Sequence, residues 1–215
     1  MKILNLYSGI GGNRKLWGDE HEITAVETDN ERAKVYKSFF PEDNVIVADA
    51  HSYLLDNFNN FDFIWSSPPC PSHSRINFAK TRRLDYPDVK LFQEIILLDN
   101  WFKGKFVVEN VISYYEPFMP RLIKEVDRHF FWSNFRIGKF QPTQKAQIRM
   151  QGKRLCVDRF SEIFGFDLSG FDLKNKRQAL RNCVHPETGK YILDCALGII
   201  EKQNTKQVDI FDFIK

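Results

Sequence analysis

The chain has 215 residues, 43% hydrophobic and 27% charged, a composition typical of a globular protein with one sizeable core. The longest strongly apolar run, Ile95 to Leu98, is far too short to cross a bilayer, and no secretory signal is recognisable. We therefore expect a cytoplasmic protein with no membrane partner, and the mild net charge of +3 does not by itself indicate a partner.

The cysteines and histidines do not form a framework. The four cysteines show no CxxC pair, which indicates reduced thiols rather than disulfides or a zinc site. The five histidines are equally scattered, so the sequence predicts no metal site.

The first segment predicts a strand, a glycine-rich turn and a short helix. Ile3–Tyr7 is apolar enough for a buried strand, and the turn after it carries Gly9, Gly11 and Gly12. Such a turn allows the backbone to approach a ligand, with the N–H groups of helix 13–17 free to bind it. An ordinary strand-to-helix turn is the alternative.

The second strand, Glu22–Val26, ends on Glu27, and a helix is expected over Asn30–Phe39. An acid at this point of a Rossmann-like unit holds a ribose diol. Helix capping is the alternative role, but Asp29 or Asn30 could supply the cap instead.

The next two strands lead to a cysteine. Val45–Val47 is followed by Asp49 and a helix over Ser52–Phe58, and the strand Phe61–Trp65 runs into Ser-Ser-Pro-Pro-Cys70. Two prolines stiffen the backbone before Cys70 and fix its place at a strand end, where α/β enzymes hold nucleophiles. An inert cysteine in a proline-rich turn is the alternative.

The fold class follows from the alternation of strands and helices. After a polar loop to about Pro87 we expect a helix whose apolar positions are Val89, Phe92, Ile96 and Leu97, and then the strand Lys105–Val108. The pattern predicts an α/β fold with a Rossmann-like, doubly wound, mostly parallel sheet. The carboxyl ends of its strands would gather Gly9, Glu27, Asp49, Cys70 and Glu109.

The remainder has a different character. It predicts a strand at Phe130–Trp132, helices at Val157–Phe164, Asn175–Arg181 and Glu187–Lys202, and an edge strand at Val208–Ile214. In the last helix the residues expected to face inward are Tyr191, Ile192, Cys195 and Ile199. We expect a cofactor-binding and catalytic domain over 1–132, a small target-recognition region over 133–174, and a segment 175–215 that returns to the catalytic domain.

Two stretches without acidic residues favour a polyanionic partner over a merely solvated face. The first stretch, 75–83, contains Arg75, Lys80, Arg82 and Arg83. The second, 133–154, contains four glutamines and six basic residues: Arg136, Lys139, Lys145, Arg149, Lys153 and Arg154.

Five motifs together resemble the S-adenosylmethionine-dependent cytosine-5 DNA methyltransferases, a family with the class I methyltransferase fold. They are the turn Leu6 to Gly12, the acids Glu27 and Asp49, Pro68-Pro69-Cys70, Glu109-Asn110-Val111, and the late stretch Arg177 to Pro186. The motifs keep the family's order and approximate spacing over most of the chain.

The resemblance implies a role for each matching residue. Cys70 would attack C6 of a flipped-out cytosine, Glu109 would hold N3, and Arg128 would contact O2. S-adenosylmethionine would contact Tyr7, Gly9, Ile10, Gly11, Gly12, Glu27, Thr28, Asp49, Ala50, Pro69, Asn182 and Val184. Double-stranded DNA would contact Arg75, Lys80, Arg82, Arg83, Arg136, Lys139, Gln144, Lys145, Gln147 and Arg149.

The chain departs from the family pattern in places. Pro71 stands where glutamine is usual, His73 replaces an aromatic residue, and the recognition region is short. The resemblance implies a DNA methyltransferase, solitary or paired with a restriction endonuclease. An RNA cytosine methyltransferase and an inactive cofactor-binding or DNA-binding relative are the alternatives.

Overall fold

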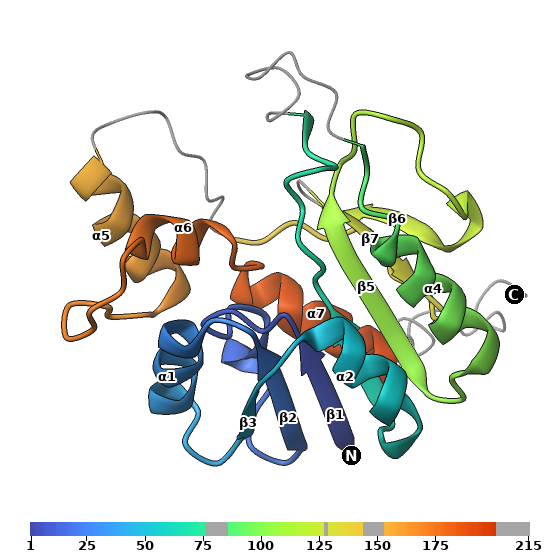
Figure 1. Ribbon diagram of the computed structural model, residues 1–215, viewed down its shortest axis with the longest axis horizontal. Coiled ribbons are helices and arrows are strands. Elements are labelled where there is room, and N and C mark those ends of the chain that lie inside the picture. The colour runs from blue at the N-terminus through green and yellow to red at the C-terminus, as the bar shows by residue number, and fades with distance from the viewer. Residues whose placement is uncertain (76–85, 127–128, 144–152, 201–215) are drawn as a thin grey trace, which may run out of the picture.

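The computed structural model describes residues 1–75, 86–126, 129–143 and 153–200. Within these ranges seven strands form one sheet in the order β3-β2-β1-β4-β5-β7-β6 (Figure 1). The strands are β1 (Lys2–Leu6), β2 (Glu22–Glu27), β3 (Asn44–Val47), β4 (Phe63–Ser66), β5 (Lys105–Val111), β6 (Ile123–Val126) and β7 (His129–Ser133). The α-helices are α1 (Asn30–Phe39), α2 (Ala50–Asn57), α4 (Lys90–Trp101), α5 (Lys153–Phe164), α6 (Lys176–Arg181) and α7 (Pro186–Ala196). Short 3-10 helices are η1 (Asn13–Leu16), η2 (Phe58–Asn60) and η3 (Pro120–Leu122).

The sheet is mostly parallel, as predicted. Strands β1 to β5 are paired in parallel, whereas β7 is antiparallel to both β5 and β6. β1 lies between β2 and β4, so the direction in which the chain adds strands reverses there. In open α/β sheets, this reversal opens a crevice at the carboxyl ends of the strands.

Helices cover both faces of the sheet because side chains alternate along each strand. Leu4 and Leu6 of β1 pack in one core cluster with Leu54 of α2 and Leu98 of α4. Ile3 points to the opposite face, into a cluster that also holds Trp17 and Ile192 of α7. A third cluster joins α1, α5 and α6, which lie together at one side of the molecule (Figure 1).

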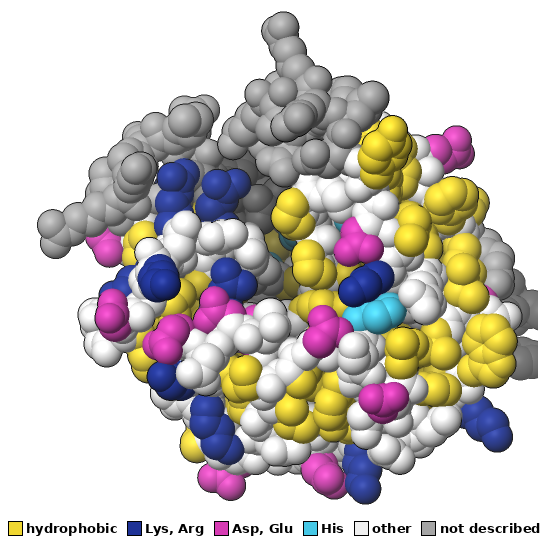
Figure 2. Space-filling view, viewed as in Figure 1, with side chains coloured by type: hydrophobic (Ala, Val, Ile, Leu, Met, Phe, Trp, Pro, Cys, Tyr) yellow, Lys and Arg dark blue, Asp and Glu magenta, His cyan; other side chains and the backbone are white. Residues whose placement is uncertain are grey.

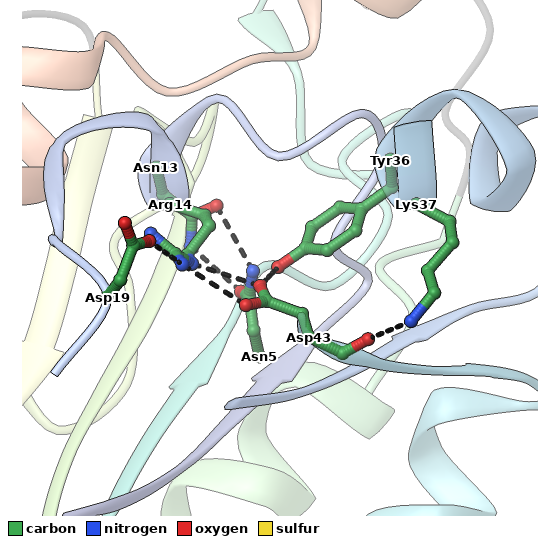
Figure 3. A network of polar contacts seen from close by, with 7 residues as sticks. All are labelled: Asn5, Asn13, Arg14, Asp19, Tyr36, Lys37 and Asp43. Atoms are coloured by element: carbon green, nitrogen blue, oxygen red, sulfur yellow. Dashed lines mark hydrogen bonds and ion pairs between the residues drawn. The ribbon is translucent and has the colours of Figure 1, made fainter. Parts of the chain in front are cut away.

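A buried polar network fixes the segment after the glycine-rich turn (Figure 3). Arg14 donates from Nε and Nη2 to the two carboxylate oxygens of Asp43, at 2.9 and 3.1 Å, and Tyr36 donates to the same carboxylate at 2.8 Å. Asn5 and Asn13 bond to each other through their side-chain amides. The cost of desolvation offsets much of the attraction in a buried ion pair, so this pair is weak evidence for added stability. Arg14 is 4% exposed and already bonded, and it is therefore not available to a ligand.

The structure differs from the sequence prediction in the inward face of α4. Its buried apolar residues are Leu91, Phe92, Ile95 and Leu98, so the expected position of Phe92 is confirmed. Val89 and Ile96, from the same expected stripe, are instead 68% and 46% exposed. The apolar residues of this segment fit two helical stripes, and the packing against the sheet selects the one at 91, 95 and 98.

Two differences concern the C-terminal half. β6 was not predicted because Ile123–Val126 is short and contains two charged residues. α7 ends at Ala196 instead of Lys202, since Gly198 adopts a φ of 68° and stops the helix, so that Ile199 is 41% exposed. The expected edge strand at 208–214 lies outside the described residues.

Candidate active site

One cavity of about 350 Å3 opens at the carboxyl ends of the central strands. Its lining comes from the segments after β1, β2 and β4, from the end of β5, and from α6 and the residues after it. Predicted site residues that line it are Tyr7, Gly9, Ile10, Gly12, Glu27, Thr28, Pro69, Cys70, Glu109, Asn182 and Val184. The fold therefore brings residues 7 and 184, far apart in sequence, to one hollow.

The glycine-rich turn is shaped by close packing and by backbone conformation. Gly9 has a φ of 57°, and no atom lies within 4 Å of the place where its Cβ would stand, so the backbone is open on that side. A Cβ on Gly12 would lie 2.5 Å from Cβ of Cys183. The segment after α6 thus packs directly on the turn, and the two together form one wall of the cavity.

Glu27 is oriented toward the glycine-rich turn. Its carboxylate accepts the backbone N–H of Gly9 at 2.8 Å and that of Asp29 at 2.9 Å. Asp29 itself caps α1 by accepting the N–H groups of Glu31 and Arg32. The helix is capped without Glu27, so capping does not explain why an acid stands at the end of β2.

Three predicted cofactor residues lie outside this cavity lining. Asp49 lines a smaller adjoining cavity with Tyr7 and Pro69, and it caps α2 through Ser52, whose N–H lowers the pKa of the carboxyl. Gly11 faces Phe40 instead, where a Cβ would lie 2.3 Å from the ring. Ala50 is 2% exposed and belongs to the core.

The Cys70 loop is held from both sides. Asn110 donates its side-chain amide to the carbonyl of Pro68 at 3.0 Å, and the N–H of His73 donates to the carbonyl of Cys70 at 3.0 Å. Burial raises the pKa of the Cys70 thiol, and the nearby carboxylate of Glu109 raises it further. At rest, Cys70 is therefore a protonated thiol in a fixed position.

Glu109 faces the same cavity from β5. Oε1 of Glu109 lies 3.5 Å from Nε2 of His129, which also lines the cavity. Arg128, expected at O2 of the base, lies outside the described residues.

A buried carboxylate that the sequence analysis missed lies behind the site. Glu94 of α4 is fully buried and accepts hydrogen bonds from the hydroxyls of Tyr7 and Ser66, each at 2.6 Å, and it pairs with Nδ1 of His51 at 2.9 Å. The sequence does contain a sign of this buried role, because Glu94 is an acidic residue within the otherwise largely apolar stretch 91–98.

This Glu94 cluster (Glu94, Tyr7, Ser66, His51) joins α4 to the ends of β1 and β4 and to the start of α2. Burial and the Glu94 carboxylate raise the pKa of Tyr7 well above its usual range, and the bond to Glu94 raises the pKa of His51. Tyr7 has a φ of 54°, unusual for a bulky residue, so its bond to Glu94 helps to hold a strained backbone in place.

The residues expected to contact nucleic acid are only partly described. Arg75 donates Nε to the carbonyl of Ser113 at 2.7 Å, so part of its guanidinium supports the fold, while Arg136 and Lys139 are exposed and do not line the cavity. The others, Lys80, Arg82, Arg83, Gln144, Lys145, Gln147 and Arg149, lie outside the described residues.

Some cavity residues were not predicted. Arg32 on α1, together with Gln178 and Arg181 on α6, borders the same cavity as Cys70. Within the part of the chain that the structure describes, no helix is long and apolar enough to cross a membrane. The same residues contain no cluster of three potential metal ligands.

Comparison with known proteins gives both a family and relatives. A family model described as C-5 cytosine-specific DNA methylase matches residues 1–117, more than half of the chain. The human tRNA (cytosine(38)-C(5))-methyltransferase is 28% identical over 105 residues, which cover 46% of this chain and 26% of that protein. The Spodoptera frugiperda protein of the same description is 36% identical over 80 residues, covering 34% of this chain and 24% of that protein. The chain spans about a quarter of the length of these curated relatives.

A solved structure extends the likeness to the whole fold. The Entamoeba histolytica methyltransferase EhMeth aligns with a TM-score of 0.58 at 12% identity, over 93% of this chain and 98% of that one. At this identity the likeness shows the fold, that of a class I methyltransferase.

Proposed function

This chain belongs to the C-5 cytosine-specific DNA methylase family, and from that premise we propose that it methylates C5 of cytosine in DNA with Cys70 as nucleophile. The observation that carries the proposal is the shared cavity, in which Cys70 and Glu109 lie with Gly9 and Glu27. The cofactor is S-adenosylmethionine, as membership of the family implies. The site residues fit it, because Gly9 leaves open space and the Glu27 carboxylate can accept ribose hydroxyls.

The chemistry requires an electron-rich C5. The Cys70 thiol first gives its proton to a base, and the resulting thiolate adds to C6, forming an S–C6 bond and turning the C5–C6 edge into an enamine. Glu109, in its acid form, donates its proton to N3 and offsets the charge that develops on the ring. When bound, the cofactor supplies an electrophilic methyl group on a sulfonium sulfur. Loss of the C5 proton to a base then lets the thiolate leave C6, which restores the aromatic ring and the free cysteine.

The resting state of Cys70 adds a requirement to this sequence of events, because a thiol with a raised pKa has to lose its proton before it attacks C6. Its thiol has a raised pKa because of burial and because of Glu109. A proton on Glu109 removes the second of these causes and favours the thiolate. We infer that the acid form of Glu109, which binds N3, makes the Cys70 thiol easier to deprotonate, while burial still raises the pKa of that thiol.

The target base must reach this cavity from a helix. In a duplex, C5 and C6 are stacked, so the cytosine is extruded at an expense of a few kcal/mol. We propose duplex DNA as the substrate, since the matching family model is that of DNA methylases. RNA is the second candidate, because the curated relatives reported above are tRNA methyltransferases.

Mechanism-based trapping tests both candidates. DNA duplexes and transfer RNA that contain 5-fluorocytosine are incubated with the protein and S-adenosylmethionine, and adducts are separated under denaturing conditions. Fluorine cannot leave C5 as a proton does, so an active enzyme remains attached through sulfur. We expect adducts with the wild type and with Cys195→Ser, and none with Cys70→Ser. A Cys70→Ser adduct would refute the assignment, and an RNA adduct without a DNA adduct would favour the second candidate.

We also propose that residues 133–154 read the target sequence. Their glutamines and arginines can make bidentate contacts with base edges, and exposed Arg136 and Lys139 can hold phosphates. Replacing Gln144, Gln147 or Arg149 should make the enzyme less selective for the base at one position of the methylated sequence. The loss of binding free energy should be about 1–3 kcal/mol. Bisulfite sequencing of a methylated random library measures this, and an unchanged pattern would point to a partner protein, such as a cognate endonuclease, as the source of specificity.

A further inference from the structure

Helix α6 presents a concentrated positive surface. From Leu173 to Pro186 the chain has no acidic residue and four basic ones, Lys174, Lys176, Arg177 and Arg181. We refer to these four as the α6 basic surface. On the face shown in Figure 2, Lys and Arg side chains gather beside the hollow, over the α5 and α6 side of the molecule.

The inward side of α6 explains why the charges point outward. Ala179 and Leu180 are 4% and 0% exposed and belong to the core cluster shared with α1 and α5. Arg177 and Arg181 are one helical turn apart, so they lie on the same side of the helix. Arg181 is exposed, whereas Arg177 is partly exposed and has its Nε buried, so that only the outer nitrogens of its guanidinium can reach a ligand.

Within the described part of the chain, the two arginines of α6 have no acidic partner, because no carboxylate lies within ion-pair distance of Arg177 or Arg181. Arg32 differs from them, since its Nε lies 3.9 Å from Oδ2 of Asp29. Arginine is suited to phosphate because its planar fork donates two parallel hydrogen bonds. The α6 basic surface thus has charge and geometry available for an anionic partner.

The surface reaches the mouth of the active-site cavity. Arg181 and its neighbour Gln178 line that cavity together with Cys70, and Arg32 of α1 lines it as well. A six-residue helix is about 9 Å long, close to the rise of roughly three nucleotides at about 3.4 Å each. A strand whose base enters the cavity would therefore place neighbouring phosphates within reach of α6.

We propose that the α6 basic surface, with Arg32, binds the phosphates that flank the target cytosine. The inference rests on the proposed function, since it takes a nucleic acid as the substrate of this cavity. It adds a contact surface that borders the cavity from α6, outside both basic stretches recognised in the sequence.

The test is the salt dependence of binding. Lys174→Gln/Arg177→Gln removes two charges without touching the cavity lining, and Lys103→Gln/Lys105→Gln removes two exposed charges at the opposite end of β5. Anisotropy of a fluorescein-labelled DNA duplex gives log K against log salt, with a fluorescein-labelled RNA hairpin as a parallel arm. Each lost phosphate contact lowers the slope by about 0.9 on duplex DNA.

For two contacts we expect the slope to fall by about 1.8 in the α6 variant and to stay unchanged in the control. Raising the salt from about 50 to 200 mM weakens the binding of both proteins. The factor by which affinity falls should be about twelve times smaller for the α6 variant than for the wild type. An unchanged slope in both arms, or an equal fall in the control, would overturn the proposal.

Calorimetry with S-adenosylhomocysteine separates the substrate from the cofactor. Arg181→Gln should weaken nucleic-acid binding and leave cofactor affinity unchanged. Weaker cofactor binding with an unchanged salt slope would assign Arg181 to the cofactor and overturn its place in the surface. Failure of the proposed function itself looks different, because the wild type would then form no 5-fluorocytosine adduct whatever the slopes are.

Discussion

Replacing Glu94 tests whether the buried cluster behind the cavity supports both the fold and the cofactor site. Glu94→Ala leaves the hydroxyls of Tyr7 and Ser66 and the imidazole of His51 without their shared acceptor. An unsatisfied buried donor costs about 1–3 kcal/mol, and the loss of one partner of a buried ion pair about 3–5 kcal/mol. Because water can enter the space left behind, we expect a total loss of about 3–5 kcal/mol, a large part of the stability of a typical domain.

Urea unfolding of Glu94→Ala and Glu94→Gln measures this loss. Glutamine keeps the volume and one acceptor, so we expect a smaller loss of about 1–3 kcal/mol. Glu22→Ala, an exposed carboxylate at the start of β2, is the matched control and should stay within about 0.5 kcal/mol of the wild type. A loss of less than about 1 kcal/mol in Glu94→Ala would refute the reasoning.

The cluster also predicts an effect on binding. Without Glu94 the strained backbone of Tyr7 is no longer held from behind, so S-adenosylhomocysteine should bind more weakly to folded Glu94→Gln. In a double-mutant cycle on the free energy of S-adenosylhomocysteine binding, Tyr7→Phe and Glu94→Gln should show a coupling free energy of about 0.5–3 kcal/mol, as expected for residues in contact. Additive effects on cofactor affinity would mean that the bond does not position Tyr7.

Three further predictions follow from the site. Glu27→Ala should weaken S-adenosylhomocysteine binding in calorimetry without changing the far-UV circular dichroism spectrum, and an unchanged affinity would remove Glu27 from the cofactor site. His51 has a raised pKa in the fold, so its contribution should be complete below about pH 6.5 and disappear as pH rises through the folded-state value. The stability difference between the wild type and His51→Asn should therefore shrink with rising pH. A difference that increases with pH would contradict the pairing of His51 with Glu94. Alkylation of Cys70 by iodoacetamide, followed by mass spectrometry, should have its pH midpoint above the ordinary cysteine range. Glu109→Gln should lower that midpoint. An unchanged midpoint would mean that the Glu109 carboxylate does not raise the pKa of the Cys70 thiol.

The parts of the site that the sequence predicts are those at strand ends. A buried strand followed by a turn, an acid or a proline pair is a local signal, and Gly9, Glu27 and Cys70 are each placed by one. The parallel order of the strands then brings them together without further information. Helix α1 has the predicted bounds for a similar reason, since Asp29 is a local capping signal.

The remaining features depend on packing between distant segments. Gly11 is expected at the cofactor from its place in the turn, whereas its φ of 90° and its close approach to the ring of Phe40 are constraints that no local pattern reveals. Glu94 has a role only because Tyr7 and Ser66 come to it from other elements. Likewise, the arginines of α6 gain their significance from the cavity beside them.

The contact between the glycine-rich turn and the segment after α6 has a consequence for the order of folding. Gly12 meets Cys183, and Gly189 of α7 lies so close to Asn13 that a Cβ on it would be 2.2 Å from the Asn13 carbonyl oxygen. These contacts join residues more than 170 positions apart, and such long loops close late in folding. During synthesis, strands β1 to β4 can pair while one wall of the cavity that holds Cys70 has still to be translated. A chain that has reached residue 170 thus carries Cys70 in an unfinished cavity, and cofactor binding reports that the last elements have docked.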